Sequence, residues 1–127
     1  MANEAVLVEF DDWPSDFTVA DATAITRGAI CMMTDPQTAS IATNGPVAVA
    51  GITARDKVAS DGRTRLGMWH NGKFLVYLSG ACAIGDPLMV CALATTYPNY
   101  VQAAGITASG AFTVGFAEET GTNGEQI

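Results

Sequence analysis

The strongest local constraint on the fold is the dipeptide Asn71-Gly72, which lies between two apolar runs at residues 64–70 and 73–78. Asn and Gly most readily adopt the positive φ angles that both central positions of a type I′ turn require. The two runs are rich in residue types that favour β-strands. The sequence therefore predicts a β-hairpin with strands near 64–70 and 73–79 and with Asn71 and Gly72 as its turn.

Short apolar segments and tight turns continue along the rest of the chain. Further strands are expected near residues 4–10, 17–19, 29–33, 47–54 and 112–117, and segment 84–90 is expected to form a turn and then a strand. Gly51, inside one of these strands, indicates a β-bulge or the close approach of another backbone. One or two short helices are also expected, a single turn at 55–60 and a helix near 97–104.

The chain of 127 residues is long enough for one compact domain and too short for two independent cores. Its composition, with 49% hydrophobic residues, 15% charged residues and 13 glycines, favours strands and turns over amphipathic helices. We therefore expect a mostly β protein, a single small domain that resembles a barrel or a sandwich. Residues 1–12 are expected to form an extended N-terminal arm or edge strand and residues 13–127 the domain, because the turn at 11–16 separates them.

The two halves of the chain share one order of turns and strands. The segments of the first half are 25–30, 49–54 and 60–66, and those of the second half are 84–88, 113–117 and 122–127. Each half contains a turn, a strand with an internal glycine, and a loop with an Asp-Gly or Asn-Gly pair. Two β-rich halves within one barrel or sandwich would explain this order. Chance similarity between Gly- and Ala-rich strands is the alternative.

The charge of the chain argues against nucleic acid as a partner. Six Lys and Arg residues stand against 13 Asp and Glu residues, giving a net charge of −7, whereas a phosphate backbone attracts clustered basic residues. The densest basic stretch, residues 55–65, is interrupted by Asp56 and Asp61, and we expect a solvated turn there.

The cysteines and the apolar segments indicate a protein made in the cytoplasm. Cys31, Cys82 and Cys91 have apolar neighbours and no Cys-x-x-Cys spacing, so reduced, buried thiols are expected. The N-terminus lacks the basic region of a secretion signal, and the apolar stretch 81–94 is too short and too broken to span a bilayer. No membrane partner is expected.

No group of residues has the spacing of a catalytic or metal-binding motif. His70 is the only histidine, and its position at the end of an expected strand favours a solvent-facing side chain over a catalytic base. Asp11, Asp12, Asp16 and Asp21 could pair as acid and base, but they lie in expected turns, where Asp bends the backbone. The sequence predicts no enzymatic activity, no cofactor and no metal.

Several motifs occur in the order found in a known family. They are NEAVLV (3–8), FTVA (17–20), ITRGAI (25–30), TDPQT (34–38), AGITARDKVASDGRTRL (50–66) and NGKF (71–74). In this order the chain resembles the capsid cement, or decoration, proteins of tailed bacteriophages and prophages. The resemblance covers residues 3–80 well and the remainder loosely. Family members finish with an apolar strand after a Gly-Glu-x-Ile element, so a final strand that is short or missing is expected here.

The resemblance implies a non-enzymatic virion protein, made in the host cytoplasm, that binds the exterior of the assembled capsid. The major capsid protein is the implied partner, and self-association on the shell, with a trimer as the form we favour, is expected as well. The N-terminal segment supplies the candidates for the capsid interface, because an extended apolar segment can pair with a neighbour's sheet edge. These candidates are Val6, Leu7, Val8, Phe10 and Trp13.

Two other functions fit parts of the sequence. A small β-barrel binding module of a phage tail or receptor-binding apparatus would have the same composition, although the aromatic residues are spread along the chain rather than clustered. A carrier domain of the biotin or lipoyl type would need a modifiable lysine at a hairpin tip. Lys73 follows Asn71-Gly72, but it lacks the flanking methionines of such a site.

Overall fold

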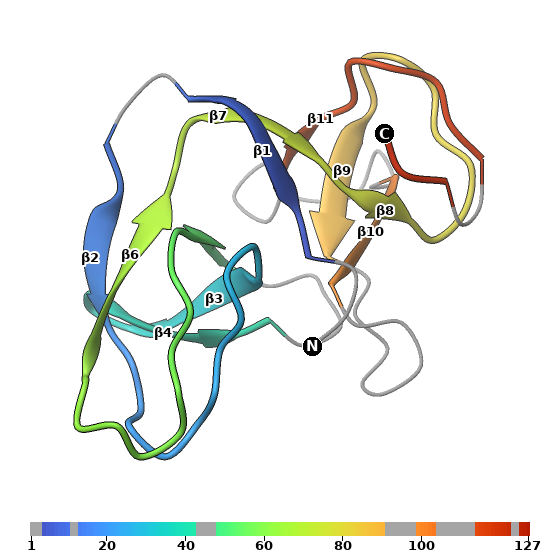
Figure 1. The fold of residues 1–127 in the computed structure, drawn as a ribbon. Helices are drawn as coiled ribbons and strands as arrows, with labels where there is room; N and C mark the ends of the chain where they lie inside the picture. Colours follow the sequence, from blue (N-terminus) through green and yellow to red (C-terminus); the bar gives the residue numbers. More distant parts are fainter. Residues whose placement is uncertain (1–3, 11–12, 43–47, 91–98, 104–113, 123–124) are drawn as a thin grey trace.

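The computed structural model describes residues 4–10, 13–42, 48–90, 99–103, 114–122 and 125–127. These residues form β-strands, turns and loops, without a helix, which confirms the mostly β fold (Figure 1). The expected short helices are wrong where the chain is described. Residues 55–60 contain an isolated bridge between Lys57 and Ile25, and Tyr100–Ala103 is a strand. Residues 97 and 98 lie outside the described part.

The first half of the chain closes into a five-stranded barrel. Its strands, in spatial order, are β2 (Ser15–Thr18), β4 (Thr38–Ile41), β3 (Ile30–Asp35), β5 (Val49–Thr53) and β6 (Arg65–Trp69). The barrel closes because β2 pairs in parallel with β4 and antiparallel with β6. The close backbone approach predicted at Gly51 in β5 is confirmed, since a Cβ there would lie 2.6 Å from the Trp69 carbonyl oxygen.

Apolar side chains on the inner face of these strands fill the barrel. Phe17, Cys31, Ala39, Leu66 and Met68 belong to this core and are almost completely buried. A barrel of so few strands has room only for side chains, not for a ligand. As far as the described residues show, the barrel interior stabilises the fold and leaves no room for a ligand.

The second half of the chain forms an open sheet beside the barrel. Its strands, in spatial order, are β11 (Gly115–Phe116), β9 (Pro87–Val90), β10 (Tyr100–Ala103) and β8 (Tyr77–Leu78). Leu78, Leu88 and Val101 of this sheet share one hydrophobic core with Ile30 and Ile52 of the barrel strands. Because this core spans both halves, they form a single body.

A two-stranded ribbon lies between the barrel and the open sheet (Figure 1). It consists of β1 (Val6–Phe10) and β7 (Gly72–Leu75), which run antiparallel. Strand β7 continues directly into β8, so the ribbon leads into the second half of the protein.

The second half repeats the strand pairing of the first half residue by residue. The antiparallel pairs Ile30–Ile52 and Cys31–Gly51 correspond to Pro87–Phe116 and Leu88–Gly115. The antiparallel pair Met33–Ala39 corresponds to Val90–Val101, and the parallel pair Thr18–Thr38 corresponds to Tyr77–Tyr100. The common order of turns and strands in the two halves of the sequence thus reflects a structural repeat. In this repeat β8, β9, β10 and β11 correspond to β2, β3, β4 and β5.

The turns that precede β3 and β9 also match. The Gly28 N–H donates to the Thr53 carbonyl at 3.0 Å, and the Gly85 N–H donates to the Ala117 carbonyl at 2.7 Å. The two glycines have nearly the same left-handed backbone, with φ of 86° and 88°. Agreement of hydrogen bonds and dihedral angles at corresponding positions argues against a chance likeness of two Gly-rich segments.

The predicted hairpin at Asn71-Gly72 is wrong. Strand β6 has β2 on one edge and β5 on the other, so no edge is left for β7, which pairs with β1 instead. A type I′ turn needs positive φ at both positions, but among the described residues around this point only Gly72 has it. The dipeptide lies instead between β6 and β7, and Gly72 is the first residue of β7.

Gly28 and Gly85 provide a matched test of backbone crowding. A Cβ at residue 28 would lie 2.5 Å from the Ala5 carbonyl oxygen, whereas a Cβ at residue 85 would have no neighbour within 4 Å. Each alanine substitution forces a left-handed conformation, so we expect Gly85→Ala to lower the free energy of unfolding by about 1–2 kcal/mol. We expect Gly28→Ala to lower it by about 3 kcal/mol or more, because the clash adds to that cost. Urea denaturation of both variants measures the difference, and equal losses would show that Ala5 moves aside freely.

Candidate functional site

The ribbon of β1 and β7 carries most of the residues that the sequence singled out. Val6 is 48% exposed, Val8 60% and Leu75 38%, and Leu7 is also exposed. Val6 lies directly opposite Leu75 in the antiparallel pairing. Apolar side chains that gather on a surface mark an interaction site more often than isolated ones do. The ribbon is therefore the candidate docking surface.

Strand β1 is an edge strand of the domain, tied down at its start. Ala5 is buried, and its N–H donates to the Gly28 carbonyl at 2.8 Å. From Val6 onward β1 pairs with β7, with a register shift between Leu7 and Glu9. In the protein by itself, residues 6–10 are thus a paired strand and not a detached arm. The other edge of β1 has no strand beside it in the described part of the chain, which leaves it open to strand addition.

The last two candidates of the N-terminal segment lie at and beyond the end of β1. Phe10 ends the strand opposite Gly72, and its side chain lies outside the description. Trp13 follows with 77% of its surface exposed, so it is not anchored in either core. The structure thus brings Val6, Leu7 and Val8 together on one strand and leaves Trp13 on the path to β2.

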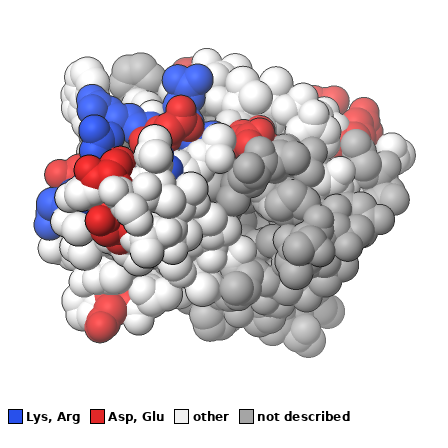
Figure 2. Space-filling view, turned by 60° about the horizontal axis from the view of Figure 1, so that its bottom comes forward, with Lys and Arg blue, Asp and Glu red and all other residues white. Residues whose placement is uncertain are grey.

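The loops at one end of the barrel hold a charged cluster around Lys57. Its Nζ donates to Asp61 Oδ1 at 2.8 Å, to Asp21 Oδ1 at 3.1 Å and to the carbonyls of Asp21 and Val58. Figure 2 shows positive and negative side chains crowded together on the barrel side of the molecule. The Lys57 side chain is fully buried, so the expected solvated turn is wrong for this residue.

The cluster shifts the protonation equilibria of its members. Burial lowers the pKa of Lys57, but hydrogen bonds and charges from Asp61 and Asp21 outweigh burial and place the pKa above its ordinary value. The hydrogen bond from Lys57, together with one from the Arg63 N–H, lowers the pKa of Asp61 to about 2. Every N–H of the Lys57 ammonium group donates a hydrogen bond to an oxygen atom. Lys57 therefore holds two loops together, and its charged, hydrogen-bonded nitrogen cannot act as a nucleophile.

The remaining reactive side chains are also accounted for by the fold. His70 is exposed, and its ring contacts Phe17 with a centroid distance of 5.5 Å. Cys31 and Cys82 are free and buried, which confirms the expectation for these two, and burial raises the pKa of Cys31 to about 12. Cys91 lies outside the described residues. Within that described part, no His, Cys, Asp and Glu side chains gather into a metal site, and no helix is long and apolar enough to cross a membrane.

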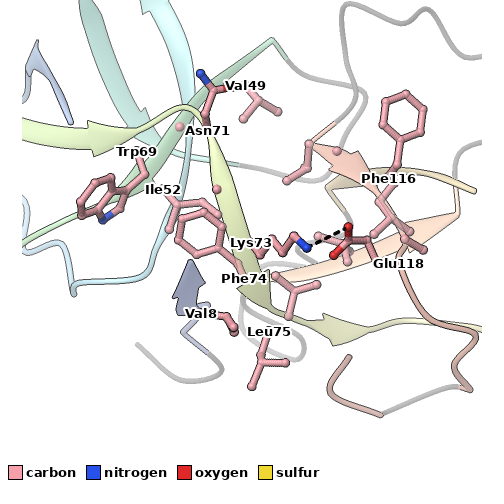
Figure 3. Close-up of a pocket in the computed structure, with 18 of the residues that line it drawn as sticks. Val8, Val49, Ile52, Trp69, Asn71, Lys73, Phe74, Leu75, Phe116 and Glu118 are labelled. Carbon is pink, nitrogen blue, oxygen red and sulfur yellow. Dashed lines mark ion pairs between the residues drawn. The ribbon is translucent and has the colours of Figure 1, made fainter. Parts of the chain in front are cut away.

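An open groove lies between β7 and β11, and Val8 of β1 is one of the residues that line it (Figure 3). It has a volume of about 870 Å³, and its lining includes Phe74, Val76, Phe116 and Ile127. Lys73 Nζ reaches across the groove to Glu118 Oε1 at 3.5 Å. The sequence did not single out this groove. No local pattern of residues could reveal it, because Phe74, Phe116 and Ile127 in its lining come from segments far apart in the chain.

Comparison with models of known protein families gives no match, and a search of curated protein sequences gives none either.

The Lys57 cluster predicts how stability depends on pH. The folded-state pKa of Asp61 lies below its ordinary value, so its contribution to stability is present above about pH 4 and is lost as the pH falls toward 2. The raised pKa of Lys57 adds stability that is lost only when the pH rises above the ordinary lysine range. We expect Asp61→Asn to destabilise the protein at pH 7. The variant should also lose less stability than the wild type as the pH falls from 5 to 2. Thermal unfolding across pH tests this, with Asp35→Asn, an exposed carboxylate elsewhere, as control. Parallel curves for Asp61→Asn and wild type would contradict it.

Proposed function

We propose that this protein is a virion structural protein of a tailed phage or prophage, which binds the exterior of the assembled icosahedral capsid. There it would stabilise contacts between subunits of the major capsid protein. The order of motifs over residues 3–80 supports this proposal. The observation that carries it is β1, an edge strand with one free side and with exposed Val6 and Val8.

Strand addition is the binding mode that suits β1. A free edge presents unpaired N–H and C=O groups, and an extended segment of a capsid subunit can satisfy them while its side chains cover Val6, Val8 and Leu75. The bulge between Leu7 and Glu9 increases local twist and limits how long a segment can pair. Because only a short segment can pair with β1, non-specific aggregation through this edge is limited. Affinity is still gained when many copies bind one shell.

The acidic surface suits the same function. A net charge of −7 keeps a small protein with exposed apolar side chains soluble before it reaches the shell. Self-association as a trimer on the capsid would place several β1 strands around one contact between subunits.

A carrier domain is the less favoured function, because its lysine must stand free at the tip of a hairpin. Lys73 lies within β7, with Glu9 at 4.0 Å and Glu118 at 3.5 Å from its Nζ. A tail or receptor-binding module remains the alternative function, and it would use the same exposed ribbon on a different partner.

The capsid proposal is tested with Val8→Asp. Val8 is exposed, so the variant should fold, but a carboxylate buried against the partner should weaken binding at least about tenfold, or roughly 1.4 kcal/mol. Val58→Asp is the matched control, because Val58 is 67% exposed on a barrel loop away from the ribbon. Co-sedimentation with expanded empty capsids of the encoding phage measures the affinity, and unexpanded capsids should not bind.

Equal binding of Val8→Asp and wild type would place the interface elsewhere on the surface. Failure of the wild-type protein to bind expanded capsids would reject the proposed function. Thermal unfolding of both variants checks that any loss of binding does not come from loss of the fold.

A further inference from the structure

The dipeptide Asn71-Gly72 does not form the turn that its sequence favours. Asn71 lies outside both neighbouring strands, because β6 ends at Trp69 and β7 begins at Gly72. The barrel holds β6 between two other strands, and β1 holds β7 through the pairing of Phe10 with Gly72. Asn71 therefore occupies a bend between two strands that are each fixed by their partners.

The side chain of Asn71 is not restrained by the described residues. It is exposed, and within the described part of the chain its amide makes no hydrogen bond. Asn99 shows the opposite arrangement, since it is only 5% exposed. Its Oδ1 accepts from the Ile30 N–H at 2.7 Å, and its Nδ2 donates to the Gly28 carbonyl at 2.9 Å. Buried hydrogen bonds at both atoms hold the Asn99 amide in place, whereas the Asn71 amide can rotate.

Gly72 supplies the second reactive group, which is its backbone nitrogen. Glycine has no Cβ, so the side chain of the preceding residue can approach this nitrogen closely. Gly72 also has a φ of 147°, a value that residues with a Cβ rarely adopt. The backbone at this point thus favours a glycine directly after Asn71.

We propose that Asn71 is a site of spontaneous modification, at which its side chain cyclises onto the backbone nitrogen of Gly72. A bond forms between this nitrogen and Cγ of Asn71, and the Cγ–Nδ2 bond breaks. The amide nitrogen leaves as ammonia, together with the proton of the Gly72 N–H, and a cyclic imide remains. Because the reacting groups belong to adjacent residues, the reaction is intramolecular and needs no enzyme.

Water then opens the ring by one of two routes. If the bond between Cγ and the nitrogen breaks, residue 71 becomes an ordinary aspartate. If the bond between the main-chain carbonyl carbon and the nitrogen breaks, the main chain runs through Cγ, and residue 71 becomes an isoaspartate. Each route consumes one water molecule and leaves a new carboxylate, and neither involves oxidation or reduction.

The isoaspartate disturbs the ribbon more than the aspartate does. It lengthens the main chain by one atom directly before Gly72, which pairs with Phe10, and Lys73, which pairs with Glu9. This extra atom works against the register of the two strands and weakens the pairing of β7 with β1. The Asn71 side chain points away from Lys73 (Figure 3). The charge of an aspartate by itself therefore has little effect on the ribbon.

The rate of the reaction in the folded protein tests the proposal. The full chain is incubated in mildly alkaline buffer, and peptide mapping by mass spectrometry follows each asparagine separately, since Asn44 and Asn123 also precede glycines. Conversion at Asn71 should run within about tenfold of the rate in a free peptide of residues 67–76, because the bend imposes little restraint. A rate more than about tenfold below that of the peptide would show that the fold protects Asn71 and would overturn the proposal.

Asn99 is the control for protection by the fold. Its conversion in the protein should be at least about tenfold slower than in a free peptide of its own sequence, because buried hydrogen bonds must open first.

The effect on the ribbon is tested with two variants. Asn71→Asp carries the new charge on an unaltered main chain, and Asn71→Gln blocks the reaction because its longer side chain cyclises far more slowly. After equal incubation, amide exchange in β1 and β7 should be faster in the wild type than in either variant. Equal exchange in the isoaspartate form and in Asn71→Asp would overturn the effect on the ribbon. None of these measurements needs a capsid, so the inference can be tested independently of the proposed function.

Discussion

The arrangement of the whole molecule depends on the carbonyl of Gly28. This oxygen accepts a hydrogen bond from the Ala5 N–H at 2.8 Å and another from the buried Asn99 side chain at 2.9 Å. The same amide of Asn99 accepts from the Ile30 N–H at 2.7 Å. The N-terminal strand, the barrel and the second sheet therefore meet at one point. Each buried backbone group left without its partner would cost roughly 1–3 kcal/mol, so few other residues could replace Asn99.

The two repeats use the same backbone for different purposes. Gln37 and Asn99 occupy corresponding turns before β4 and β10, and both have positive φ, of 51° and 64°. Gln37 is exposed, whereas Asn99 is buried between the halves. The corresponding glycines Gly28 and Gly85 differ in the same way. The close approach of Ala5 requires a glycine at residue 28, whereas residue 85 has open space around it. A repeated unit can thus keep its hydrogen bonds while only one copy carries the contacts that join the halves.

Much of the fold could be predicted from the sequence, and the errors have physical causes. Strands β3 and β5 were predicted because their residues are apolar or β-branched and flanked by Gly and Asp. Strand β4, Thr38–Ile41, was missed because its residues alternate weakly, and pairing with β3 and β2 makes it a strand. The hairpin failed because the turn propensity of Asn71 and Gly72 is local, whereas barrel closure had already used both edges of β6. The exposed N-terminal strand was anticipated, but its partner β7 depends on contacts too distant in sequence for local patterns to reveal.

Closure in one repeat and openness in the other have a consequence for motion. In a closed barrel every strand has two neighbours, so its amide protons exchange with solvent only when the whole barrel opens. In the described part of the chain, β11 has only β9 beside it, so its outer amides can exchange through local fraying without disturbing the barrel. We therefore expect amide exchange to be slow in the barrel strands and faster at β11.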